Sequence, residues 1–148
     1  KILMQALPHM LRYDEAIVLY QEALGDILYP TPYIAEANLG WAKYMKGQTD
    51  EAITHIKTAV TVNPKFCLGF RNLGTIYDET QQTAEACKQF QKYREACSDV
   101  PDAYLREGVC LAKLGQVAQA RAAFDGCTAK ASGAVKEDCA RLREKLGP

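Results

Sequence analysis

The sequence has little that would direct it to a nucleic acid or into a membrane. Among its 148 residues, 18 Lys and Arg balance 18 Asp and Glu, and no run of like charges exceeds a few residues. Nucleic-acid binding rests on neutralising phosphates with a basic surface, so we predict no nucleic-acid partner. No apolar segment approaches the roughly 20 residues that span a bilayer.

The common motifs of catalysis, metal binding and nucleotide binding are also missing. The sequence has no Gly-rich phosphate loop, no H-E-x-x-H pattern and no C-x-x-C pair. Its two histidines, His9 and His55, lie far in sequence from any cysteine, and His55 beside Ile56 favours a surface or partly packed residue. We therefore predict no enzyme, no metal and no cofactor. A Cys–His nucleophile is the remaining alternative, but paired cysteines would remove the thiolate that it needs.

A 34-residue period is the main positive feature. It relates three sets of residues: the glycines Gly40, Gly74 and Gly108, the alanines Ala52, Ala86 and Ala120, and the bulky apolar residues Ile56, Phe90 and Phe124. Such a period is typical of a solenoid, in which each helix pair buries its core against its neighbours. The glycine lets the second helix of a pair approach closely, and we expect the alanine to lie against it.

The period divides the chain into units. Residues 33–66, 67–100 and 101–134 form three full repeats, and Asn38-Leu39-Gly40, Asp50-Glu51-Ala52 and Asn63-Pro64 follow the tetratricopeptide (TPR) consensus. Position 7, before the glycine, carries Leu39, Leu73 and, less typically, Glu107. We therefore predict a single all-α domain, a TPR superhelical solenoid of antiparallel helix pairs over residues 1–148.

The ends depart from the period. Asp14-Glu15-Ala16 repeats the second-helix pattern, which predicts a partial leading unit over 1–25 whose first helix lies within residues 1–10, with Pro8 kinking or ending it. Residues 26–32 carry Pro30 and Pro32 and predict an extended connector. A capping helix is expected over 135–146, with an apolar stripe of Val135, Cys139, Leu142 and Leu146. The chain opens part-way through a repeat, without an initiator Met or a secretory signal, so we expect it to be a fragment.

Six cysteines are many for a cytosolic helical protein, and an even count suggests disulfides in an oxidising compartment. Antiparallel helices bring together residues that are mirror images about the intervening turn. This rule pairs Cys67 with Cys97 about residue 82, Cys87 with Cys110 about the junction 98–99, and Cys127 with Cys139 about residue 133. The alternative is that several are free, small buried residues, above all Cys127, which occupies a core position.

In a TPR array the first helices line the concave surface, mainly through positions 2, 5, 6, 9, 12 and 13. The first repeat offers Ile34, Ala37, Asn38, Trp41, Tyr44 and Met45; the second offers Leu68, Arg71, Asn72, Thr75, Asp78 and Glu79; the third offers Asp102, Leu105, Arg106, Val109, Ala112 and Lys113. Aromatic residues often anchor interfaces. We predict partner binding through Asn38, Trp41, Tyr44, Met45, Arg71, Asn72 and Arg106.

Two alternatives concern this surface. The single tryptophan, Trp41, could instead pack against the leading unit or the Tyr29–Tyr33 segment. A two-carboxylate clamp for chaperone C-termini fits Asn72 and Arg106, but Ala37, Trp41 and Asp102 stand where it needs other residues. Asp102 would repel a carboxylate, so the clamp is disfavoured.

One stretch is more specific than the TPR consensus. The residues from Gly25 to Glu36, GDILYPTPYIAE, then Asn38-Leu39-Gly40-Trp41-Ala42 and Asn63-Pro64-Lys65-Phe66-Cys67, resemble the Tgl-like type IV pilus pilotins of the PilF/PilW class. The resemblance covers roughly residues 13–148.

The resemblance implies a lipoprotein on the periplasmic face of the outer membrane, with the pilus secretin as its protein partner. Its only membrane attachment would be a lipid anchor outside this fragment. Assisting secretin assembly or localisation is the implied role, and that oxidising location agrees with the cysteine count. The runner-up is a general periplasmic TPR scaffold for envelope or cell-wall assembly. A third class, an enzyme regulator or cytosolic co-chaperone, would require free thiols.

Overall fold

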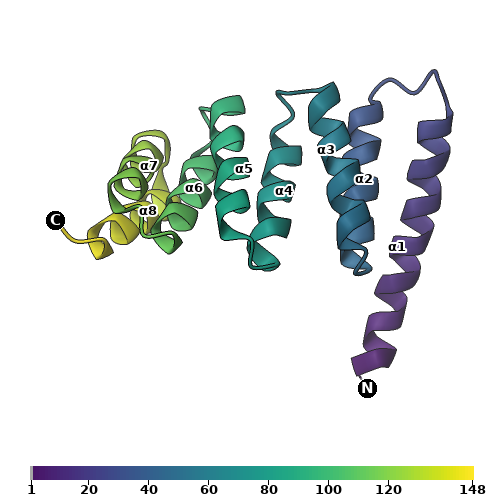
Figure 1. Ribbon diagram of the computed structural model, residues 1–148, viewed down its shortest axis with the longest axis horizontal. Helices are drawn as coiled ribbons and strands as arrows, with labels where there is room; N and C mark the ends of the chain where they lie inside the picture. Colours follow the sequence, from purple (N-terminus) through teal and green to yellow (C-terminus); the bar gives the residue numbers. More distant parts are fainter. Residues whose placement is uncertain (1) are drawn as a thin grey trace. The chain divides into compact units, whose positions relative to one another are not determined.

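The structure is a computed structural model that describes residues 2–148, with side chains described from residue 11 onward. Over these residues it contains helices only, coloured along the chain in Figure 1. They are α1 (Ile2–Gly25), α2 (Pro32–Met45), α3 (Thr49–Val62), α4 (Cys67–Glu79), α5 (Thr83–Ala96), α6 (Pro101–Lys113), α7 (Val117–Lys130) and α8 (Gly133–Lys145). Two compact units divide the chain, residues 1–72 and 73–148, and the division falls within α4.

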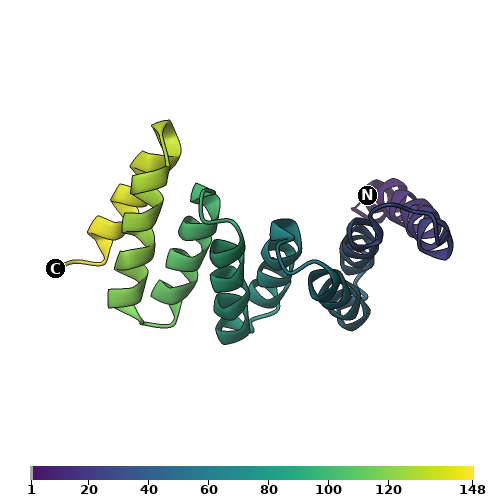
Figure 2. The same ribbon diagram turned by 90° about the horizontal axis from the view of Figure 1, so that it is seen from above.

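The same tight turn ends the first helix of each repeat. Gly47, Gln81 and Gly115 occupy the same position of the 34-residue period and have φ values of +86°, +66° and +77°. After each of them a backbone N–H bonds back across the turn, as from Gln48 to the carbonyl of Lys43 at 2.9 Å. The next helix can then fold back beside the first, as α2 and α3 do in Figures 1 and 2.

The repeated glycines sit where two helices meet. A Cβ on Gly108 would lie 2.6–3.0 Å from three ring atoms of Phe124, and one on Gly40 would lie 2.6 Å from Ile56 Cγ1. We expected the alanine of the second helix to lie against each glycine. At Gly40 this holds, since a Cβ there would lie 2.9 Å from the Ala52 carbonyl oxygen. At all three glycines the bulky residue four positions after the alanine also covers the site, because a side chain can lie flat on a helix that has no Cβ there. The alanines Ala52, Ala86 and Ala120 are fully buried.

The leading segment differs from the expected pair of short helices. One continuous helix, α1, runs from Ile2 to Gly25 and includes position 8. A proline inside a helix removes one backbone hydrogen bond without necessarily ending it. The connector that follows is a hydrogen-bonded turn. Leu28 N–H donates to Asp26 Oδ1 at 2.9 Å and Tyr29 N–H donates to the Asp26 carbonyl at 3.0 Å. Pro32 then opens α2, where its missing N–H costs nothing.

The capping helix α8 packs on α7. Leu142 and Leu146 contact the cluster of Leu111, Ala120, Ala123 and Phe124, as an apolar stripe predicts. Val135 departs from that stripe, since it remains 41% exposed in the first turn of the helix.

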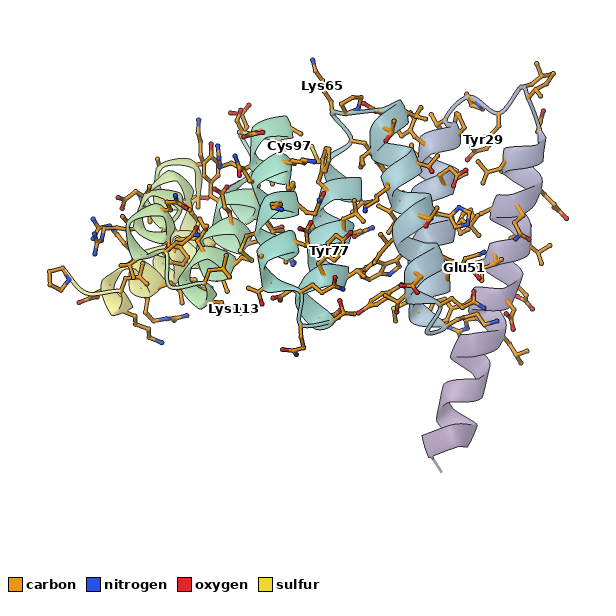
Figure 3. All side chains as sticks on the ribbon, viewed as in Figure 1. Tyr29, Glu51, Lys65, Tyr77, Cys97 and Lys113 are labelled. Carbon is orange, nitrogen blue, oxygen red and sulfur yellow. A yellow bond between two sulfur atoms is a disulfide. The ribbon has the colours of Figure 1, made fainter. Side chains whose placement is uncertain are left out.

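Disulfides join neighbouring helices in the C-terminal unit. Cys87 on α5 is bonded to Cys110 on α6, with Cα atoms 5.5 Å apart, and Cys127 on α7 is bonded to Cys139 on α8, with Cα atoms 6.1 Å apart. These pairs coincide with two of those that the mirror rule predicts. No cysteine is free among the described residues. Cys97 is labelled in Figure 3.

Candidate functional site

Helix α2 carries an aromatic pair in the N-terminal unit. The rings of Trp41 and Tyr44 lie 5.4 Å apart at 48°, one helical turn from each other. Both side chains are half-buried, while the neighbouring Met45 is 42% exposed. Asn38, one turn before Trp41, is also half-buried. The predicted anchor residues are therefore adjacent on one helix and partly open to a partner.

Ion pairs hold α2 against α3. Lys43 Nζ lies 2.7 Å from Glu51 Oε2, and His55 Nδ1 lies 2.8 Å from Glu36 Oε2. The hydrogen bond from Lys43 and its charge hold the pKa of Glu51 below the ordinary glutamate value. Glu51 is labelled in Figure 3. His55 thus has a structural partner, which fits the expectation of a partly packed surface residue.

The two predicted site residues on α4 differ in accessibility. Asn72 is only 9% exposed, so its amide offers little surface to a partner. Arg71 is half-buried and already engaged in an interaction within the protein.

A groove lies along α6 in the C-terminal unit, which we call the α6–α8 groove. It consists of two hollows of about 360 and 350 Å³ that share Val109, Lys113 and Leu142. The lining includes all six concave positions predicted for the third repeat, namely Asp102, Leu105, Arg106, Val109, Ala112 and Lys113. Phe90 and Leu142 add apolar surface to the first hollow, and Phe124 and Leu146 add it to the second.

Three ion pairs surround the first hollow. Lys113 Nζ lies 2.9 Å from Asp78 Oδ1, Arg106 Nε lies 2.9 Å from Asp102 Oδ2, and Arg141 Nη2 lies 3.1 Å from Asp138 Oδ1. Tyr93 Oη also donates to Asp102 at 2.9 Å. Each of the three cations already has a carboxylate beside it, so this groove is poorly suited to clamp an incoming carboxylate. It is suited to an apolar side chain with a charge-balanced rim around it.

Helix α8 forms part of the wall of this groove, which its sequence did not predict. Arg141, Leu142, Lys145 and Leu146 all line it, although we expected α8 only to cover the last repeat. The spacing of Leu142 and Leu146 does predict an apolar face on this helix. It does not predict that part of this face lines an open groove, because spacing gives only the direction of the side chains around the helix.

Two features are absent from the part of the chain that the structure describes. No group of three or more His, Cys, Asp or Glu side chains there could hold a metal ion. None of its helices combines the length and apolar character needed to cross a membrane.

The helix pairs, the 34-residue spacing and the close contacts at the repeated glycines define the class of fold: the chain is an all-α solenoid of tetratricopeptide type. The family model described as Tetratricopeptide repeat matches residues 71–99 and 102–132.

Individual proteins resemble the chain to different extents. Tetratricopeptide repeat protein 28 of Mus musculus is 37% identical over 78 residues, which are 53% of this chain and 3% of that protein. PilW, a type IV pilus biogenesis factor, has a crystal structure with a TM-score of 0.73 and 24% identity, covering 90% of this chain and 61% of that one. The first TPR of Spaghetti (RPAP3), bound to the HSP90 peptide SRMEEVD, has a TM-score of 0.64 and 15% identity, covering 78% of this chain and 94% of that one. At these identities the solved structures show the fold alone, and the chain spans a small part of the curated relative.

Proposed function

We propose that this chain is a non-catalytic binding module that acts in type IV pilus biogenesis and assists assembly or localisation of the outer-membrane secretin. The observation that carries protein binding is the α6–α8 groove, whose lining includes all six concave positions of the third repeat. Three of these, Leu105, Val109 and Ala112, are apolar. The resemblance of the Gly25–Glu36 stretch to the pilotins and the fold shared with PilW support the pilus assignment.

The chemistry of the two surfaces suggests how the partner is held. Trp41, Tyr44 and Met45 offer an aromatic and apolar anchor on α2, and Leu105, Val109 and Leu142 offer an apolar hollow beside α6. Apolar anchors of this kind provide most of the binding energy at interfaces, whereas the paired charges at the rim exclude mismatched partners. The disulfide-bonded cysteines support a periplasmic location, where such bonds persist.

Capture of the secretin from an outer-membrane extract by the immobilised chain tests this proposal. We expect Trp41→Ala and Leu142→Glu each to weaken capture by about tenfold or more, as loss of an interface anchor does. Val135→Glu is the matched control for Leu142→Glu, because Val135 lies on the same helix, is exposed and lines neither hollow. Circular dichroism checks that each variant is folded.

The outcomes separate the alternatives. Normal capture by both Trp41→Ala and Leu142→Glu would move the site to another surface. The parent chain could instead capture other envelope proteins and no secretin. If Trp41→Ala and Leu142→Glu then lost those proteins, the result would favour the general periplasmic scaffold.

A further inference from the structure

Helix α1 repeats the pattern of the second helices α3, α5 and α7, but it buries less of it. Each α1 residue corresponds to the α3 residue 36 positions later, as Ala16 does to Ala52. Three positions of this pattern are at most 5% exposed in every full repeat, namely Ala52, Ile56 and Ala59, then Ala86, Phe90 and Tyr93, then Ala120, Phe124 and Cys127. The α1 residues at these positions, Ala16, Tyr20 and Ala23, are only half-buried.

In the first full repeat a first helix covers this face. A Cβ on Gly40 of α2 would lie 2.6 Å from Ile56 Cγ1 and 3.2 Å from His55 Cβ on α3. Helix α1 packs against α2 and forms the outer edge of the N-terminal unit in Figures 1 and 2. Residues 2–10 extend α1 along its own axis and do not fold back beside it. No described part of the chain therefore takes the place of a first helix on α1.

Position 23 of the repeat shows the consequence for an apolar side chain. Gln89 and Ala123 at this position are 7% and 6% exposed, and His55 is half-buried. Leu19 at the same position of α1 is 63% exposed. It lies three and four residues from its half-buried neighbours, so all of them share one face of the helix. We call this the open face of α1, and it consists of Glu15, Ala16, Leu19, Tyr20 and Ala23.

The charge on the open face indicates which kind of helix would cover it. Glu51 of α3 pairs with Lys43 of the covering helix α2 at 2.7 Å. Glu15 stands at the same position of α1, is exposed and has no ion pair with any described residue. A cation placed on the covering helix as Lys43 is on α2 would therefore meet a carboxylate on α1.

The charges of α1 also disfavour a second copy of this chain as the cover. Antiparallel packing brings together residues that are mirror images about the centre of the contact. If two open faces were superposed in this way, Glu15 of one copy would lie close to Glu22 of the other. Both are exposed and neither has an ion pair with a described residue, so the like charges would repel.

We propose that the open face of α1 binds one amphipathic helix of a partner protein, in the place that α2 takes on α3. Three residues of that helix are specified, at successive spacings of four and three. The first is apolar and faces Leu19, the second is Gly or Ala and lies under Tyr20, and the third is Lys or Arg and pairs with Glu15. They correspond to the α2 residues Glu36, Gly40 and Lys43, which contact the same positions of α3. This surface is distinct from the α6–α8 groove, so its test does not depend on the function proposed above.

Fluorescence anisotropy with a labelled peptide tests the proposal. The peptide has the sequence of residues 32–46 with Glu36→Leu, so it presents an apolar residue, Gly40 and Lys43 at the required spacing. We expect it to bind about tenfold more tightly than the same peptide with Gly40→Leu, because a leucine does not fit under Tyr20. Leucine favours a helix more than glycine does, so helix formation alone would give the opposite order. Equal or tighter binding of the Gly40→Leu peptide, or binding of neither at millimolar concentration, would overturn the proposal.

A pair of variants of the chain locates the bound peptide. Leu19→Glu should weaken binding about tenfold, since it places a charge where the apolar contact forms. Val18→Glu is the matched control, because Val18 is the next residue of the same helix and is 52% exposed. Its position is exposed in all three full repeats and should stay outside the contact. Equal losses in the two variants would place the peptide elsewhere and refute the assignment.

A charge reversal tests the register. Glu15→Lys should weaken binding of the first peptide about threefold to fivefold, as loss of an exposed ion pair does. A peptide that also carries Lys43→Glu should bind this variant better than it binds the parent chain. If the reversed peptide shows no such preference, Glu15 does not face the third specified residue and the proposed geometry is wrong.

Sedimentation equilibrium tests the choice between a partner protein and a second copy. We expect the chain alone to be a monomer at micromolar concentration. A dimer that Leu19→Glu dissociates and Val18→Glu does not would assign the open face to a second copy and overturn the proposal.

Discussion

At the residue scale, the contact between Gly108 and Phe124 shows how little space separates the two helices of a repeat. Phe124 is almost fully buried and cannot turn away, and a Cβ on residue 108 would come within 2.6 Å of its ring. Gly108→Ala should therefore lower the free energy of unfolding by about 1–3 kcal/mol, the usual cost of overpacking a core.

Chemical denaturation measures this effect, with Gly25→Ala as the control. Gly25 is helical, has open space where a Cβ would stand and does not have a positive φ. Alanine there should leave stability unchanged or raise it by about 0.5–1 kcal/mol. Equal stability of the two variants would mean that α6 and α7 do not approach as closely as the structure shows.

At the scale of an element, one covalent bond ties α8 to α7. Its only buried residue is Cys139, which is bonded to the fully buried Cys127 on α7. Ser132 at its N-cap makes no side-chain hydrogen bond, and its first turn has no acidic residue to complement the helix dipole. Besides this disulfide, Leu142 and Leu146 pack α8 on the array. An exposed ion pair of Arg143 with Asp125 and a hydrogen bond from Arg121 to the Gly147 carbonyl add to these contacts, which keep the wall of the α6–α8 groove in place.

Replacing both partners, Cys127→Ala with Cys139→Ala, should lower the free energy of unfolding by about 2–4 kcal/mol. Hydrogen exchange should rise most in α8, because its packing is lost first. The matched control is Cys87→Ala with Cys110→Ala, which removes the bond between α5 and α6 and leaves the tie between α7 and α8 intact. Faster exchange of α8 in that control alone would show that α8 is held by something else.

At the scale of the whole molecule, the redox state of the six cysteines distinguishes a periplasmic from a cytosolic location. With all six cysteines paired, the intact mass should be lower by six hydrogens than that of the reduced chain, and the native protein should not react with iodoacetamide. Mass spectrometry with and without reductant measures both quantities. Free thiols in the native chain would favour a cytosolic regulator or co-chaperone over a periplasmic module.

The sequence by itself determined the all-α repeat architecture. Helix pairing follows from residues that recur every 34 positions, and Gly47, Gln81 and Gly115, which form the turns, hold one position of that period. The pairs Cys87–Cys110 and Cys127–Cys139 follow from the same mirror symmetry, because both partners lie on sequence-adjacent helices.

Only the tertiary structure decided what the side chains form together. It joined residues 2–25 into one helix, brought α8 into the wall of the α6–α8 groove, and paired Lys113 with Asp78. It also left one face of α1 open, although the corresponding positions of α3, α5 and α7 are buried. The physical reason is that periodicity tells which face of a helix is buried, whereas the shape and charge of a surface depend on residues from several helices. Those residues, such as Asp78, Lys113 and Leu142, become neighbours only when the helices pack.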